Sequence, residues 1–259
     1  MTNEQLIKKW IKAEGKGVEI GAFLTPLPVI KPYYVDYFEE YAGAKCLLDF
    51  KGDACSLPFK DCSLDYVATS HVIEHVANPI QALAEWVRVL VDGGIIYMVV
   101  PDRRKTWDRK RPATLAKHML EDFRKGVAQN DPTHVQDFSD GIIWSEFAPG
   151  QSEDDRLAYR KVLEDSTAAG LEINIHFHTF EPSSFSTVID SVNHSGLLSS
   201  YLRINEIVED FPSNNPNGFL VVLTVEGGVA KKTKSFINSC LRYFSKDWPV
   251  HDGIVRYRR

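Results

Sequence analysis

Short apolar segments alternate with amphipathic segments through residues 17–101, and this pattern is typical of βαβ units. The last apolar segment, IIYMVVP, has the composition of a strand that is buried on both faces of a sheet. We expect five strands in this region: residues 17–23 supply the first strand and the turn that follows it, and the others lie at 33–38, 46–50, 64–72 and 95–101. The sequence therefore predicts an α/β protein with a mostly parallel sheet.

One helix is well marked between the last two of these strands, from Pro79 to Leu90. Proline suits the first turn of a helix, and the apolar residues of the segment recur at helical spacing. The sequence Asp92-Gly93-Gly94 then predicts the end of the helix. We expect this helix and the later helices to cover both faces of the sheet.

The pattern loosens after residue 101 into a stretch rich in charged and aromatic residues, which we interpret as a helical insertion after the fifth strand. Helices are expected near residues 114–127 and 152–169, and another begins at Glu181. Two further strands, at residues 198–208 and 218–227, would complete a seven-stranded sheet. We expect a single domain over 1–259, divided into a cofactor-binding core, an acceptor-binding insertion, a sheet completion and a basic tail, at 17–101, 102–180, 181–227 and 228–259.

The composition, 44% hydrophobic and 25% charged over 259 residues, is that of an ordinary globular domain. The net charge of -5 lacks the basic excess that nucleic-acid binding requires, so we expect no nucleic-acid partner. The four cysteines have neither the spacing of a zinc site nor the density of a disulfide scaffold. The polar N-terminus and the lack of a long apolar run predict no signal peptide, no transmembrane segment and a cytoplasmic location.

Candidate chemistry begins where the first strand ends, at Glu19-Ile20-Gly21. Gly21 has no Cβ, so a ligand can approach the backbone closely there. Asp36 follows seventeen residues after Glu19, close to the offset at which doubly wound folds place an acid against ribose hydroxyls. After the third strand, Asp53 and its neighbours could hydrogen-bond the edge of an adenine. This arrangement predicts a nucleoside-binding site.

The segments VEIGAF, YVDYF, GDACSLPF, DYVATSHVIEHV and IIYMVVPD together resemble the class I S-adenosylmethionine-dependent methyltransferases, in order and spacing, over residues 17–102. The resemblance implies a Rossmann-like fold and S-adenosylmethionine as the cofactor. It also implies contacts for each part of that cofactor: the methionine end at Glu19, Gly21, Ala22 and Phe23, the ribose at Asp36, the adenine at Asp53 and Ala54, and the sulfonium near His71. The chain departs from the family pattern at Phe23 and Thr25, where further glycines are common, so this loop is expected to differ in shape from that of the family.

The segments EIGAFLTP, PDRRKTWD and HFHTFEPSSF resemble a branch of this family that is associated with glycan and glycosyltransferase loci. The resemblance implies a sugar, nucleotide-sugar or glycan acceptor, methylated on oxygen by in-line transfer with a general base. A nitrogen or carbon methyltransferase of another small molecule, or a protein that binds the cofactor without catalysis, remain alternatives. A nicotinamide-dependent oxidoreductase is less favoured, because no GxGxxG follows the first strand.

Histidines and one aspartate are the candidate bases, because they are expected at the edge of the sheet where open α/β folds bind ligands. His176 is the first candidate, with His134, His178 and Asp102 behind it. His71, Glu74 and His75 also match an inverted zinc-protease pattern, but that pattern needs a helix, and here a strand ends. We expect no metal site.

Cations gather just after the fifth strand, at Arg103, Arg104 and Arg111, with Trp107 among them. Arginine binds phosphate or carboxylate, and tryptophan offers a stacking face, so an anionic acceptor is one prediction. The alternative is a solvated loop whose charges pair with neighbouring acids. The basic tail could cover the site, form a homodimer contact, meet an anionic membrane surface or pack as an ordinary helix.

Overall fold

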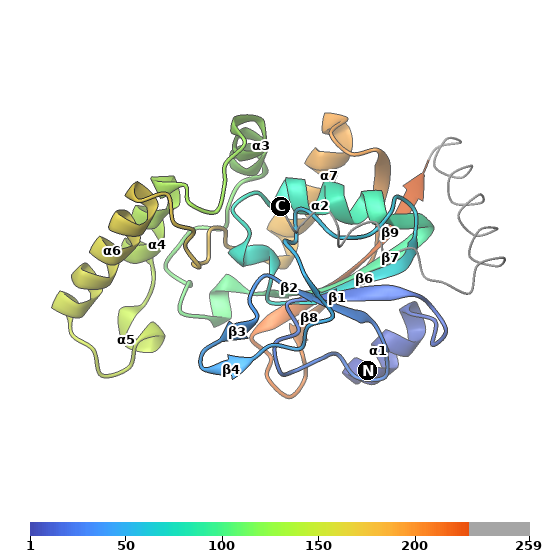
Figure 1. The fold of residues 1–259 in the computed structure, drawn as a ribbon, viewed down its shortest axis with the longest axis horizontal. Helices are drawn as coiled ribbons and strands as arrows, with labels where there is room; N and C mark the ends of the chain where they lie inside the picture. The colour runs from blue at the N-terminus through green and yellow to red at the C-terminus, as the bar shows by residue number, and fades with distance from the viewer. Residues whose placement is uncertain (228–259) are drawn as a thin grey trace.

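The computed structural model of the chain describes residues 1–227. Its centre is a seven-stranded sheet (Figure 1) in the order β5-β2-β1-β6-β7-β9-β8. The first five strands of that order run parallel, and β9 is antiparallel to both of its neighbours. The strands are β1 Gly17–Ile20, β2 Tyr33–Asp36, β5 Phe50–Lys51, β6 Leu64–Ser70, β7 Leu90–Pro101, β8 Ser200–Phe211 and β9 Gly218–Gly227. The predicted α/β fold, Rossmann-like with a mostly parallel sheet, is confirmed.

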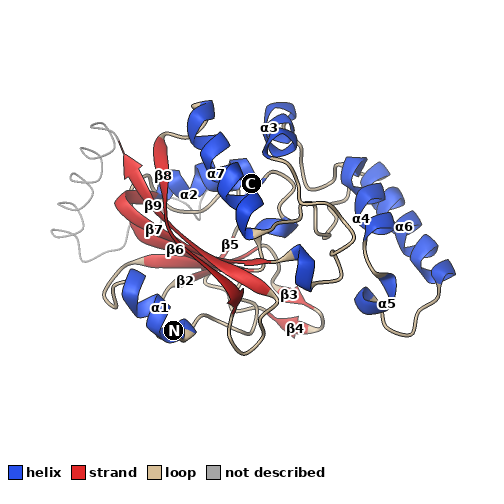
Figure 2. Cartoon of the chain, turned by 180° about the vertical axis from the view of Figure 1, so that it is seen from behind, coloured by secondary structure: helices blue, strands red, loops and turns tan. Residues whose placement is uncertain are grey.

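The two faces of the sheet carry separate hydrophobic clusters, because side chains alternate along each strand. In β7, Met98 packs into the cluster under α2 (Pro79–Val89) and α7 (Pro182–Ser195), whereas Tyr97 packs into the cluster beside α1 (Asn3–Trp10). Figure 2 shows α2 and α7 on one side of the strands and α1 on the other. Helices thus cover both faces, with more of them on the face of α2.

The helix α1 has no counterpart among the predicted elements. Only Leu6 and Ile7 are buried among its eight residues, so its apolar periodicity is weak. The signal that was available is the capping box, in which the Thr2 side chain accepts a hydrogen bond from the Gln5 backbone N–H. The Tyr97 hydroxyl donates to Asn3 Oδ1 at 2.8 Å, which ties this short helix to the sheet.

The third strand is shorter than predicted, because only Phe50–Lys51 pairs with β2. The chain between β2 and β5 instead forms a small hairpin of β3 (Glu40–Tyr41) and β4 (Ala44–Lys45). The prediction of a strand at 46–50 was therefore wrong for all but its last residue.

The helix end predicted at Asp92-Gly93-Gly94 lies inside β7 instead. The helix α2 stops at Val89, and β7 pairs with β6 at Leu90 and then again only from Ile95 onward. The residues between are looped out as a bulge, where Gly93 has φ +79°. Turn-forming residues thus mark a break in strand pairing here rather than the end of the helix.

A helical subdomain lies between β7 and α7, at one end of the sheet (Figure 1). It contains α3 (Ala116–Lys125), α4 (Val135–Gly141), α5 (Trp144–Phe147) and α6 (Glu153–Ala168), together with 3₁₀ turns at Arg103–Lys105 and Pro132–His134. It has its own hydrophobic cluster, formed by Val127, Val135, Phe138, Ile142, Trp144, Leu163, Ile173, Ile175 and Phe177 with Ala77 of the core. The 3₁₀ turn Ile73–His75 lies directly after β6, between the sheet and this subdomain.

No helix among residues 1–227 is long and apolar enough to cross a bilayer. The basic tail, including the helix expected within it, lies outside the described residues.

Trp86 offers a test of how α2 supports the rest of the fold. Its side chain is fully buried, and its Nε1–H donates to the Ala54 carbonyl at 3.0 Å. Trp86→Phe removes ring volume and leaves that carbonyl without the donor, so we expect the free energy of unfolding to fall by about 2 kcal/mol. Urea denaturation measures it. Tyr201→Phe, at an exposed tyrosine of β8, is the control, and an equal loss there would contradict the prediction.

Candidate active site

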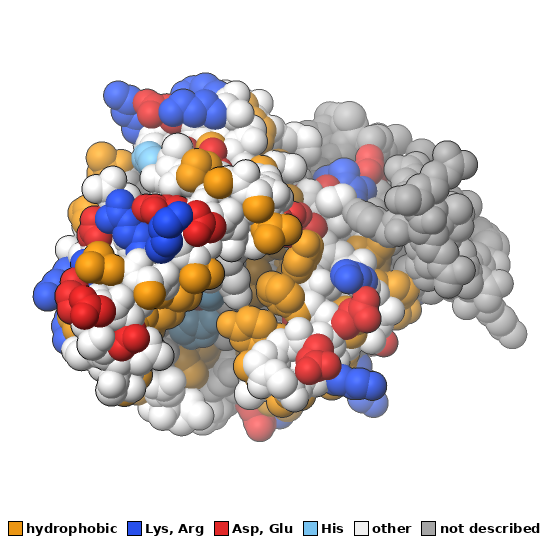
Figure 3. Space-filling model, turned by 60° about the vertical axis from the view of Figure 1, so that its left-hand side comes forward, with side chains coloured by type: hydrophobic (Ala, Val, Ile, Leu, Met, Phe, Trp, Pro, Cys, Tyr) orange, Lys and Arg blue, Asp and Glu red, His pale blue; other side chains and the backbone are white. Residues whose placement is uncertain are grey.

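A cavity of about 890 Å³ lies at the carboxyl ends of β1, β2 and β6. Its walls come from the loops after these strands and after β5, and from residues 170–174 and Gln129 of the helical subdomain. Its size is that of a small-molecule site, and its position is where open α/β sheets bind ligands. Figure 3 shows a hollow in the surface with hydrophobic side chains along its rim.

Gly21 makes the tight turn that opens the cavity at the end of β1. It has φ +68°, and a Cβ at this position would lie 2.6 Å from Cγ2 of Val72. Any other residue would therefore be strained in its backbone and would also collide with Val72. Phe23, two residues later, also has a positive φ of 49° and lines the cavity, so the chain keeps the turn without the family's additional glycines.

Asp36 and Asp53 lie on neighbouring walls of the same cavity. Asp36 is the last residue of β2, and its Oδ1 accepts a hydrogen bond from the Phe38 N–H at 3.0 Å. Burial raises the pKa of this carboxyl against the opposing effect of the backbone donors. Asp53 Oδ1 accepts from the Cys55 N–H at 2.7 Å, which shapes the loop that presents Ala54 to the cavity. Two carboxylates on rigid turns can thus each receive hydrogen bonds from a ligand.

Glu19 lies beneath the Gly21 turn rather than on the cavity wall. It is 1% exposed, its Oε1 accepts from the Leu27 N–H at 2.9 Å, and its Oε2 has no hydrogen-bond partner among the described residues. Burial raises the pKa of this carboxyl to about 7. A carboxylate with one unpaired buried oxygen fits a site that is completed by a donor or a cation.

His71 forms the far wall of the cavity, directly after β6. Its Nδ1 lies 3.5 Å from Oε1 of Glu74, which is fully buried. Burial alone would lower the pKa of His71, but the nearby carboxylate of Glu74 raises it above the ordinary value. The residue also has φ +54°, an uncommon conformation for a non-glycine residue and one that often marks functional positions. The imidazole thus faces the cavity with a buried carboxylate behind it.

His176 stands one layer behind the cavity. Its Nδ1 lies 2.6 Å from Oδ2 of Asp108, and its ring packs on Trp107 and against His75, with centroids 4.1 and 4.6 Å apart. His75 lines the cavity, whereas His176 and Trp107 do not. Arg111, which is 1% exposed, donates to Asp108 and also pairs with Asp137. The predicted first base is thus an oriented imidazole that reaches the cavity only through His75.

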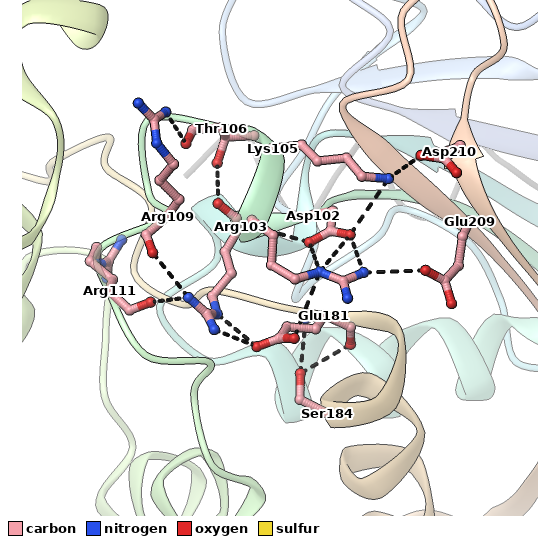
Figure 4. A network of polar contacts seen from close by, with 11 residues as sticks. Asp102, Arg103, Lys105, Thr106, Arg109, Arg111, Glu181, Ser184, Glu209 and Asp210 are labelled. Carbon is pink, nitrogen blue, oxygen red and sulfur yellow. Dashed lines mark hydrogen bonds and ion pairs between the residues drawn. The ribbon is translucent and has the colours of Figure 1, made fainter.

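The other predicted cations and Asp102 belong to a salt-bridge network away from the cavity (Figure 4). Asp102 is fully buried, and its carboxylate pairs with Arg104 at 2.6 Å. Arg103 pairs with Glu181 at 2.6 Å. Each of these arginines, and Arg111, already holds a carboxylate, so the structure does not bring the predicted anion-binding residues to the cavity. The alternative prediction, that these charges pair with neighbouring acids, describes their placement, although Arg111 is buried rather than solvated.

His134 and His178 lie beside Asp122 of α3, and neither lines the cavity. Sequence reasoning also missed part of the wall, namely Gln129, Glu172 and Asn174. The sequence signal for Glu172 and Asn174 was the alternation of polar and apolar residues over 172–177, in which the apolar residues Ile173, Ile175 and Phe177 are buried. The residues between them then point to the other side, toward the cavity and His75.

Residues 30–98 match the methyltransferase domain family. The matched part of the chain belongs to a methyltransferase domain. The match covers the strands and turns that carry Asp36, Asp53 and His71.

Other similarities of this methyltransferase domain are partial or distant. A 57-residue segment is 49% identical to an uncharacterized 37.1 kDa protein in transposon Tn4556 of Streptomyces fradiae, and it covers 22% of this chain and 15% of that protein. Solved methyltransferases from Methanosarcina mazei (16% identity, TM-score 0.48, 88% and 100% of the two chains) and Mesorhizobium loti (12%, 0.45, 85% and 96%) are similar in structure. Because these sequence identities and TM-scores are low, the methyltransferase assignment depends on the family match.

Glu19 gives the methyltransferase domain a predictable dependence of stability on pH. The pKa of its carboxyl is about 7 in the folded protein and has the ordinary value of 4.5 in the unfolded chain. Between these two pH values the folded state therefore holds a proton that the unfolded state has lost. The free energy of unfolding therefore falls as pH rises through this window, by on the order of 3 kcal/mol from this group. Glu19→Gln removes the charge, so the variant should be more stable than wild type at about pH 8 and nearly equal at about pH 4.5.

Urea denaturation across this pH range measures the difference, with Glu4→Gln on the exposed face of α1 as the control. An unchanged pH dependence in Glu19→Gln would contradict the assigned burial of the charge.

Proposed function

We propose that this domain transfers a methyl group from S-adenosylmethionine to a hydroxyl of a neutral sugar or glycan. The observation that carries the proposal is the His71–Glu74 pair on the wall of the cavity that also presents Gly21, Asp36 and Asp53. An acceptor hydroxyl must lose a proton as it is methylated, and a histidine held by a carboxylate supplies the base.

The residues of the cavity fit the cofactor part by part. Asp36 would accept hydrogen bonds from the ribose hydroxyls, and the loop of Asp53 and Ala54 would meet the adenine. The turn from Gly21 through Ala22 to Phe23 would hold the methionine end, above the unpaired oxygen of Glu19. When bound, the cofactor supplies an electrophilic methyl group on a sulfonium.

Glu74 determines what His71 can do. With Nδ1–H directed at the buried carboxylate, the neutral imidazole keeps its Nε2 lone pair for an acceptor proton. Once protonated, the imidazolium would be stabilised by Glu74, as the carboxylate of a catalytic triad stabilises its histidine. His176, held by Asp108, would position His75 at the same wall.

A neutral polyhydroxylated acceptor is supported by what lines the remaining cavity. Phe23, Tyr37, Phe38 and Tyr41 form an aromatic rim whose rings contact one another, and such rings can cover the apolar face of a sugar. Glu172, which contacts Tyr37 of this rim, and Asn174 are further polar groups of the wall that can hydrogen-bond hydroxyls, whereas the side chain of Gln129 is already bonded to the backbone. Arg103, Arg104 and Arg111 are engaged with carboxylates, so the proposal requires no phosphate on the acceptor.

Cofactor binding tests the first half of the proposal. Asp36→Ala removes the hydrogen bonds to the ribose, so we expect calorimetric titration with S-adenosylmethionine to show affinity reduced by roughly 10–100-fold. Asp190→Ala, an exposed aspartate on α7, serves as the control and should bind like wild type. If a folded wild-type protein binds no S-adenosylmethionine, the proposal fails.

Methyl transfer to a panel of neutral sugars tests the second half. His71→Asn keeps a residue that tolerates positive φ but removes the base, so we expect kcat to fall by about 10²–10⁴-fold with cofactor binding retained. The wild-type rate should rise with pH through the raised pKa of His71, because only the neutral imidazole accepts a proton. His194→Asn, an exposed histidine, is the control. If the protein methylates amine acceptors and His71→Asn leaves that kcat unchanged, a nitrogen methyltransferase would be favoured instead.

A further inference from the structure

Three imidazoles and one carboxylate converge beside α3, and none of them lines the cavity. They belong to His118 and Asp122 on α3, to His134 in the turn before α4, and to His178. One ligand atom of each lies within 4.8 Å of all the others. His134, His178 and Asp122 are buried, whereas the side chain of His118 is 47% exposed.

The three separations among His118, Asp122 and His134 are close to the edge of a tetrahedron around one ion. His118 Nε2 lies 3.0 Å from His134 Nε2 and 3.2 Å from Asp122 Oδ2, and His134 Nε2 lies 3.6 Å from that oxygen. Ligands on a tetrahedral Zn²⁺ at roughly 2.0–2.1 Å stand about 3.3 Å from one another. The three measured distances bracket this value.

The hydrogen bonds around the cluster fix which nitrogens carry protons. His178 Nε2 lies 3.2 Å from the Ala77 carbonyl, which can only accept, so Nε2 is protonated and Nδ1 carries the lone pair. The Thr133 hydroxyl donates to Asp131 and lies 3.2 Å from His134 Nδ1, so this nitrogen is the donor and His134 Nε2 is bare. Carbonyl and hydroxyl partners of this kind orient histidines that bind metals.

Bare, electron-rich atoms therefore face one another inside the protein. His178 Nδ1 is buried without a hydrogen-bond partner among the described residues, and Asp122 Oδ2 and His134 Nε2 share the single nitrogen His118 Nε2 as their nearby partner. Unpaired buried acceptors are costly, and acceptors that face each other also repel. A cation in the middle satisfies all of them.

We propose that His118, Asp122, His134 and His178 bind one divalent cation of tetrahedral preference, Zn²⁺ above all. Imidazole nitrogens with a carboxylate suit this ion, and four protein ligands make a closed, structural site. The half-exposed His118 lies on the side from which the ion enters. This site is distinct from the inverted zinc-protease pattern, whose residues lie on a 3₁₀ turn beside the cavity.

The ion would join parts of the chain that are far apart in sequence. It would fix α3 and the turn before α4 to His178, whose Nε2–H holds Ala77 of the core. The segment that ends at His178 also carries Asn174 in the cavity wall and His176 behind His75. The metal would thus hold the helical subdomain against the cofactor-binding core, whichever acceptor the cavity takes.

The test is metal binding by the full chain, stripped with a chelator and titrated with Zn²⁺ alone. We expect one Zn²⁺ per chain, a higher melting temperature with the metal, and a tetrahedral visible spectrum when Co²⁺ replaces it. His118→Ala and Asp122→Asn should each weaken binding by more than the roughly 10–100-fold that loss of an outer partner costs. His194→Ala, an exposed histidine on α7, is the matched control and should bind as wild type does.

His118→Ala keeps the test valid if buried substitutions unfold the protein, because this ligand is the most exposed of the four. Absence of stoichiometric binding by the folded wild type would overturn the proposal and leave a proton-sharing cluster. Full binding that survives in the double variant His118→Ala/Asp122→Asn would also overturn it, and would place the ion elsewhere, for example at Glu74, His75 and His176. An octahedral Co²⁺ spectrum would equally contradict it.

Discussion

The close approach of Gly21 to Val72 is the constraint on which the cavity depends. It brings the turn after β1 against the turn after β6, at a distance that leaves no room for a Cβ. Gly21 and His71, one residue before Val72, both have positive φ, so each turn leaves its strand sharply. The turn between them carries no side chain at Gly21, and the chain can therefore present Asp36 and His71 on opposite walls of one cavity.

The core of this arrangement could be predicted from the sequence because its signals are local. The strands, the helix α2 and the acids at strand ends follow from apolar runs and from residues at fixed offsets, and Gly21, Asp36, Asp53 and His71 all line one cavity. The errors at 46–50 and at residues 92–94 have one cause. A strand ends where its neighbour stops pairing with it, and that depends on a partner elsewhere in the chain.

The helical subdomain could not be predicted in the same way, because its polar residues find partners across long stretches of chain. Arg111 reads as an anion-binding residue in the sequence, yet it is buried against Asp108 and Asp137 and donates to the backbone of the 176–177 segment. His176 was selected by residue type, and the structure adds the Asp108 partner that no spacing indicates. A segment rich in charged residues shows how many charged side chains are present, but only the fold shows which of them already form ion pairs.

The position of β9 has a consequence for how the chain folds as it is synthesised. This strand follows β8 in sequence but lies between β7 and β8 in the sheet, and its first eight residues are buried. The long apolar edge of β7 thus stays unpaired until residue 227 has been made, more than a hundred residues after β7 itself. Pairings this distant form slowly, and an open apolar edge can pair with other chains meanwhile. A nascent chain of this protein is therefore most exposed to aggregation just before its last described strand emerges.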